Sequence, residues 1–71
     1  MEIDKREWKY RFATNLKIIM IDRGYNQRTF AEALGVNEST VSRYLSGLMT
    51  PTGPMITKIA KLLRCEVSDF M

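Results

Sequence analysis

Two short segments with the apolar spacing of helices lie on either side of Gly35 in this chain. The first follows Asn26 and places three apolar residues on one helical face: Phe30, Ala31 and Leu34. The second follows Asn37 and does the same with Val41, Tyr44 and Leu45. Asn is a favoured N-cap, and Gly35 and Gly47 are favoured helix stops because a residue without a Cβ adopts the left-handed C-terminal conformation at little cost. The sequence therefore predicts two short helices joined by a tight turn, over residues 27–46.

Further helices are predicted on both sides of this pair. Asp4 can cap a helix that places Glu7 at its third position and ends near Arg23, before Gly24. Its apolar stripe is Trp8, Phe12, Leu16, Ile19 and Met20. After a loop at 48–52, another helix carries Ile56, Ile59, Ala60 and Leu63, and residues 67–71 add a last turn. We expect an all-α, compact bundle of four to five helices in a single domain, 1–71, in which residues 1–15 extend the first helix.

Composition restricts the classes of function that this chain can have. A chain of 71 residues buries only about 60% of its unfolded surface, which suits one domain. Cys65 is the single cysteine and His is absent, so no internal disulfide, Cys/His zinc site or other metal or cofactor site is expected. Without His, and with scattered carboxylates, the sequence offers no catalytic set, so we expect no enzyme. No signal peptide or apolar run of membrane length is present, and we expect a protein of the bacterial cytoplasm.

The charge of the chain is unevenly placed. The net charge is +3, and it arises in residues 1–28, whereas the basic and acidic residues of 29–71 cancel. A basic end suggests a polyanion such as DNA as the partner, although a solvated helix face would look the same.

The central pair has the spacing of a helix-turn-helix. Counted from Gln27, Ala31 is the fifth residue, where the two helices cross closely, and Gly35 is the ninth, in the turn. Residues 16–71 resemble the Cro-type helix-turn-helix domain of phage repressors and related bacterial regulators, the XRE family. The residues that carry the resemblance are Gly24, Gln27, Phe30, Ala31, Leu34, Gly35, Val36, Thr40, Val41, Ser42, Gly47, Pro51, Ile59, Ala60 and Leu63.

The resemblance implies that the second helix of the pair reads double-stranded operator DNA in a major groove. Carried over by position, the base contacts are Asn37, Glu38, Ser39, Thr40 and Arg43, and the phosphate contacts are Asn26, Gln27 and Ser46. The chemistry agrees, because an arginine pairs with guanine and a carboxylate accepts from the amino group of cytosine. Asparagines at these positions also serve as simple caps, and Glu38 is a favourable charge in a first helical turn.

Two departures from the family pattern matter. Many members pair an Arg in the first helix with a Glu late in the third, and Met20 and Leu45 stand there in this chain. Apolar replacement of a buried ion pair is often neutral or stabilising, so we expect both residues to be buried against each other or a shared neighbour. The loop after Gly47 also lacks the usual basic residues. Instead we expect an apolar protein interface there, made of Leu48, Met49 and Phe70, with Met55 and Met71 nearby.

Trp8, Tyr10 and Phe12 alternate with basic residues near the N-terminus. This pattern occurs in nucleic-acid-binding segments, but at helical spacing it favours Trp8 and Phe12 as part of the core. Cys65 stands where an apolar residue is usual, which predicts a small buried hydrophobe rather than a reactive thiol.

Two functions fit these observations. The first is a sequence-specific DNA-binding transcriptional regulator, a small Cro-like phage or prophage repressor of the kind found in a lysogeny switch, that forms a weak homodimer. The alternative is an antirepressor or modulator that binds a partner repressor protein through the loop after residue 47. An antitoxin is a third option.

Overall fold

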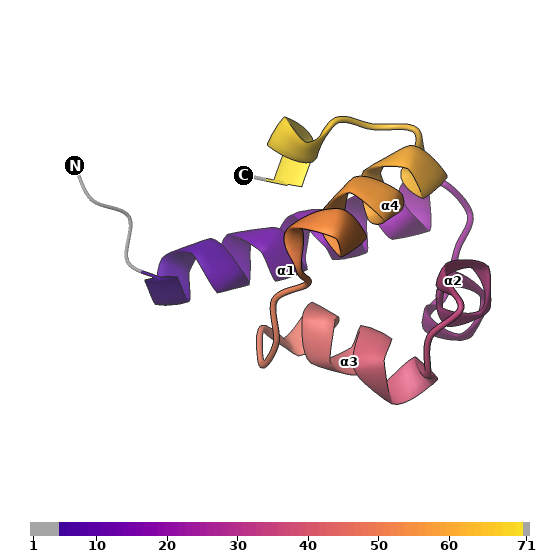
Figure 1. Ribbon diagram of the computed structural model, residues 1–71, viewed down its shortest axis with the longest axis horizontal. Coiled ribbons are helices and arrows are strands. Elements are labelled where there is room, and N and C mark those ends of the chain that lie inside the picture. The colour runs from indigo at the N-terminus through magenta and orange to yellow at the C-terminus, as the bar shows by residue number, and fades with distance from the viewer. Residues whose placement is uncertain (1–4, 71) are drawn as a thin grey trace.

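The computed structural model describes residues 5–70 of the chain, with side chains from Glu7 onward. Its elements are α1 (Lys5–Asp22), α2 (Gln27–Leu34), α3 (Glu38–Ser46), α4 (Gly53–Leu63) and the 3₁₀ helix η1 (Val67–Phe70). Within this range the chain forms no strand, so the predicted all-α bundle is confirmed. In Figure 1, α3 lies below the long helix α1, α2 is seen end-on, and η1 lies above α4. The proposed cap Asp4 lies outside the described residues.

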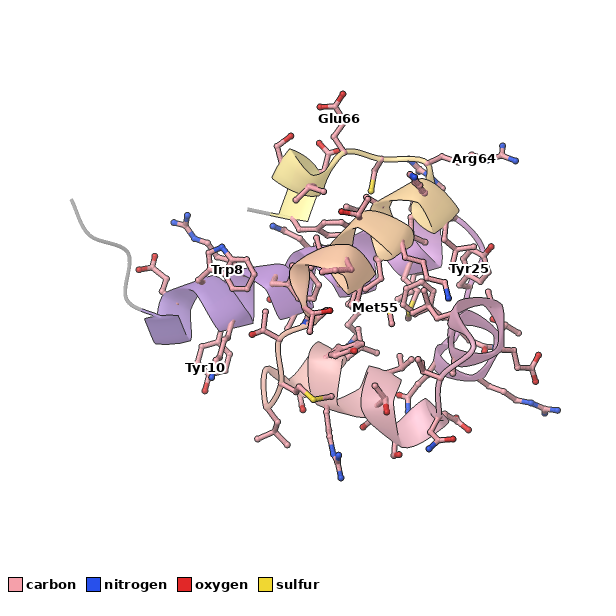
Figure 2. All side chains as sticks on the ribbon, viewed as in Figure 1. Trp8, Tyr10, Tyr25, Met55, Arg64 and Glu66 are labelled. Carbon is pink, nitrogen blue, oxygen red and sulfur yellow. The ribbon has the colours of Figure 1, made fainter. Side chains whose placement is uncertain are left out.

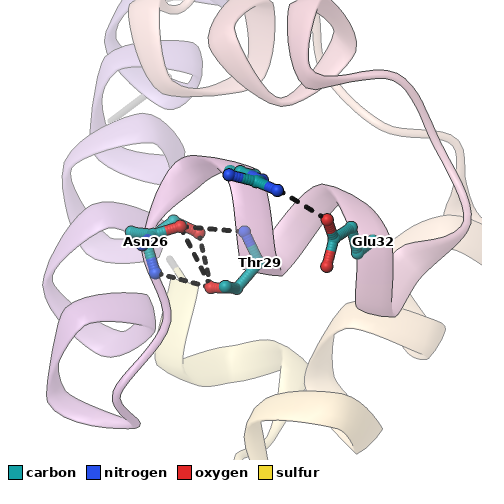
Figure 3. Close-up of polar contacts among 4 residues, drawn as sticks. Asn26, Thr29 and Glu32 are labelled. Carbon is teal, nitrogen blue, oxygen red and sulfur yellow. Dashed lines mark hydrogen bonds and ion pairs between the residues drawn. The ribbon is translucent and has the colours of Figure 1, made fainter.

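The helix ends follow the predicted stops. Gly35 and Gly47 occupy the C-cap positions of α2 and α3 with φ angles of 73° and 79°, the left-handed region that glycine tolerates best. Asn26 caps α2 in a reciprocal arrangement with Thr29 (Figure 3): its Oδ1 accepts from the Thr29 amide at 2.8 Å, and its own amide donates to Thr29 Oγ1 at 2.9 Å. Asn37 holds the corresponding place before α3, but its side chain makes no cap hydrogen bond. The expectation that this side chain caps α3 is therefore wrong.

The hydrophobic core draws on every described element. Its largest fully buried side chains are Phe12, Leu16, Phe30, Leu34, Val41, Ile59, Leu63 and Phe70. Trp8 stacks on Phe12 with ring centroids 5.7 Å apart, so the N-terminal part of α1 extends over the core as expected. Met20 is buried, and Leu45 packs half-buried against the same cluster. These two residues, which stand where many family members have an Arg and a Glu, therefore belong to one core.

Phe70 is part of this core and not of a surface. Its side chain is 1% exposed and its ring centroid lies 5.3 Å from that of Phe12. Asn15 fixes the position of η1, because its Nδ2 donates to the Phe70 carbonyl oxygen at 3.0 Å. The prediction of Phe70 as an interface residue is therefore wrong: the chain turns back after α4 and packs this ring against α1. Met71 lies outside the described residues.

Two basic side chains hold the C-terminal ends of neighbouring helices. Lys58 Nζ donates to the Leu34 carbonyl oxygen at 2.8 Å, and Arg23 Nε donates to the Leu63 carbonyl oxygen at the same distance. A cation there also offsets the negative end of the helix dipole. These hydrogen bonds join α4 to α2 and the end of α1 to α4, and so help to hold α2 in place beside α3.

Cys65 is half-buried and packs against the core. Burial raises the pKa of its thiol, the nearby Asp69 carboxylate raises that pKa further, and Arg23 lowers it in part. The protonated form is therefore favoured, as expected for a packing residue. In the part of the chain that the structure describes, no helix is long and apolar enough to cross a membrane, and no cluster of three metal-binding side chains occurs.

Candidate nucleic-acid interface

The outer face of α3 is a continuous polar surface. Val41 and Tyr44 are buried and anchor the helix on α1 and α2. At about 100° of rotation per residue, the opposite side of the helix presents five residues within an arc of about 140°. All five are exposed: Glu38, Ser39, Ser42, Arg43 and Ser46. An anchored helix with one open polar face has the form that a major groove accommodates.

The N-terminal end of α3 continues this surface. Asn37 is exposed, and because its side chain makes no cap bond, its amide can donate to or accept from a base edge. Thr40 is only half-exposed, at the margin of the polar arc. Of the five predicted base contacts, four are therefore well exposed, and Thr40 is the least accessible.

The predicted phosphate contacts differ in what their side chains do. Asn26 is exposed, with its Oδ1 held by Thr29, so its amide NH₂ is the part that can donate to a phosphate. Gln27 is half-buried, and its Nε2 donates to the Glu38 carbonyl oxygen at 3.4 Å. This weak bond links the first residues of α2 and α3. The hydroxyl of Ser46 donates to the Arg43 carbonyl oxygen at 3.2 Å, so it must rotate before it can donate to a phosphate.

The electrostatics of this surface are nearly neutral. Across α2 and α3, Arg28 and Arg43 are balanced by Glu32 and Glu38. Arg28 and Glu32 form an exposed ion pair, with Nε and Oε1 3.5 Å apart (Figure 3). Arg43 makes no ion pair among the described residues and is the cation of α3 that remains able to bind an external partner.

The loop after α3 exposes less apolar surface than predicted. Leu48 is 77% exposed, whereas Met49 and Met55 are half-buried against the core. Tyr10 instead lies close to this loop: a Cβ on Gly47 would stand 3.2 Å from its ring. The apolar surface beside α3 therefore consists of Leu48 and the 63% exposed Tyr10, and the predicted trio of Leu48, Met49 and Phe70 does not form a surface.

Two residues of this region were not among the predicted contacts. Ser42 lies within the exposed arc, and its spacing of four residues from Glu38 was the signal that could have found it. Tyr10 is brought to the end of α3 by the packing of α1, 37 residues away in sequence from Gly47, and no local pattern indicates that contact.

Comparison with known proteins identifies the class to which this fold and surface belong. Residues 16–70 match the helix-turn-helix family, so the chain belongs to that family, in its XRE type, and is by class a DNA-binding transcription regulator. The fold is similar to the crystal structure of the restriction-modification controller protein C.AhdI from Aeromonas hydrophila. That comparison has a TM-score of 0.81 and 24% identity over 89% of this chain and 96% of the controller chain. No curated protein matches the sequence.

Proposed function

We propose that the protein is a sequence-specific operator-binding regulator that inserts α3 into a major groove. The observation that carries this proposal is the exposed polar arc on α3, opposite the buried Val41 and Tyr44. In this arrangement Arg43 pairs with guanine, Asn37, Glu38 and Ser39 face base edges, and the first turn of α2 meets the phosphates. The resemblance of residues 16–71 to the Cro-type domain favours a Cro-like repressor of phage or prophage origin.

A restriction-modification controller is a second candidate. The similarity of the fold to C.AhdI, over nearly the whole of both chains, favours it. For either candidate we propose that α3 enters the major groove, and the two differ in the genes that this chain would regulate. The antirepressor hypothesis has less support than the sequence suggested, because Phe70 is buried and Leu48 is left with Tyr10 as its exposed apolar neighbour.

A selection from random DNA duplexes at low salt tests the proposal. We expect enrichment of a motif with two half-sites, about 10 base pairs apart from centre to centre, because a two-fold dimer places its reading helices one helical turn apart. Enrichment of a single half-site would mean that the protein binds DNA as a monomer, and it would contradict the proposed weak homodimer. If no motif is enriched, the protein is not a sequence-specific reader.

A further inference from the structure

A basic cleft lies where the C-terminal ends of α1 and α4 meet. Its volume is about 470 Å³, within the range of about 300–1,000 Å³ that small-molecule sites occupy. It is lined by Arg23, Tyr25, Lys61, Leu62 and Arg64. Figure 2 shows Tyr25 and Arg64 at the end of the molecule formed by α4 and the start of α2, away from α3 as labelled in Figure 1. The cleft therefore lies away from the outer face of α3, although Tyr25 in its lining directly precedes Asn26, a predicted phosphate contact.

The positive charges of this cleft are unequally compensated. The guanidinium of Arg23 pairs with Asp22 and donates to the Leu63 carbonyl oxygen. Lys61 and Arg64 are exposed and form no ion pair with any described side chain. Glu66 lies near in sequence, but its side chain points in another direction from that of Arg64 (Figure 2). Two cations therefore remain available to an anion that enters the cleft.

The backbone of Arg64 ends α4 and sets where its side chain projects. Arg64 is the C-cap of α4 and has a φ of 57°, whereas the other positive-φ residues described are Gly24, Gly35 and Gly47. A side chain at such a position costs free energy that glycine avoids. The conformation itself is that of a common helix end, in which the Arg64 amide donates to the carbonyl oxygens of Ala60 and Lys61. Neutralising the helix dipole does not require Arg64, because Lys61 and Arg23 already lie at the end of α4.

The remaining lining residues supply an apolar wall. Tyr25 is half-buried, and its ring meets that of Phe30 edge-on with centroids 5.8 Å apart, so the tyrosine is held in place. Leu62 is also half-buried and packs against the core. A ligand that fills the cleft would meet a flat ring and an aliphatic side chain next to the two uncompensated cations.

We propose that this cleft binds a small phosphorylated compound. Its phosphate group, which carries nearly two negative charges at neutral pH, lies against Arg64 and Lys61, and its organic part lies against Tyr25 and Leu62. The planar guanidinium forms two parallel hydrogen bonds to phosphate oxygens, and the lysine adds a point charge. The proposal does not depend on the way in which α3 reads DNA.

Titration of the protein with phenyl phosphate, followed by backbone amide shifts, tests this inference. We expect saturable shifts at residues 23–25 and 61–64. Arg64→Gly should weaken binding by about tenfold or more, because a charge-assisted hydrogen bond is lost. The same variant should keep its Tm or raise it by up to about 8 °C, since glycine relieves the positive φ. Lys17→Ala removes an exposed charge of α1 outside the cleft and is the matched control, which should bind phenyl phosphate like the wild type.

Three results would overturn the inference. An equal loss of affinity in Lys17→Ala would mean that only the net charge attracts the probe. A fall in Tm with unchanged affinity in Arg64→Gly would assign Arg64 to helix capping alone. Displacement of phenyl phosphate by a short DNA duplex that shifts the same amides would assign the cleft to DNA backbone binding.

Discussion

At the scale of single residues, the two asparagines that precede α2 and α3 show how similar positions take different roles. Asn26 exchanges two hydrogen bonds with Thr29, and this closes the first turn of α2. Asn37 has the same extended backbone, with a ψ of 150°, yet its side chain makes no cap bond. Position 40, three residues on, is also a threonine, so the two helices begin with the same residue types at these positions. We therefore expect the Asn26 side chain to stabilise the fold, whereas the Asn37 side chain stays free of cap bonds and able to contact DNA.

Paired alanine substitutions test this division. Asn26→Ala should lower the free energy of unfolding by about 0.5 to 2 kcal/mol, the usual cost of losing an N-cap side chain. Asn37→Ala should change it by less than about 0.5 kcal/mol, because no intramolecular bond is removed. Urea unfolding of both variants measures the two values. Equal destabilisation by the two substitutions would show that the Asn37 side chain caps α3 after all.

At the scale of elements, the bounds of the helices could be predicted, whereas the packing of the last turn could not. Glycines after α2 and α3 and asparagines before them mark the ends, because these residues act through local backbone geometry. The direction of η1 depends instead on the bond between Asn15 and the Phe70 carbonyl, which joins residues 55 positions apart. The contact between Gln27 and Glu38 is likewise non-local. The candidate site could be located from the sequence, but the bonds inside it could not.

The packing of η1 predicts that Phe70 stabilises the fold and Leu48 does not. Phe70→Ala should cost about 3 to 5 kcal/mol, as truncation of a buried aromatic ring does. Leu48→Ala removes an exposed side chain and should change stability by less than about 0.5 kcal/mol. Thermal unfolding of both variants followed by circular dichroism gives the comparison. A fully stable Phe70→Ala variant would return Phe70 to the surface and restore the predicted interface.

At the scale of the whole molecule, the net positive charge of the chain lies outside α2 and α3, the two helices of the proposed reading surface. The basic residues of α2 and α3 are balanced by Glu32 and Glu38, and the loop after α3 carries no cation. If α3 approaches DNA as proposed, we expect few counterions to be released, so that non-specific attraction is weak and discrimination comes from base contacts. This places most of the expected specificity on Arg43, the cation of α3 without a described partner.

The most direct test of DNA reading by α3 compares Arg43→Ala with Gln27→Ala on the selected duplex and on a scrambled duplex at one salt concentration. Arg43→Ala should lose about 1 to 3 kcal/mol of preference for the selected sequence, and Gln27→Ala should weaken binding to both duplexes alike. Fluorescence anisotropy titrations measure all four affinities against those of the wild type. If Arg43→Ala keeps the full preference for the selected sequence, α3 does not read the bases through this residue, and the central claim is contradicted.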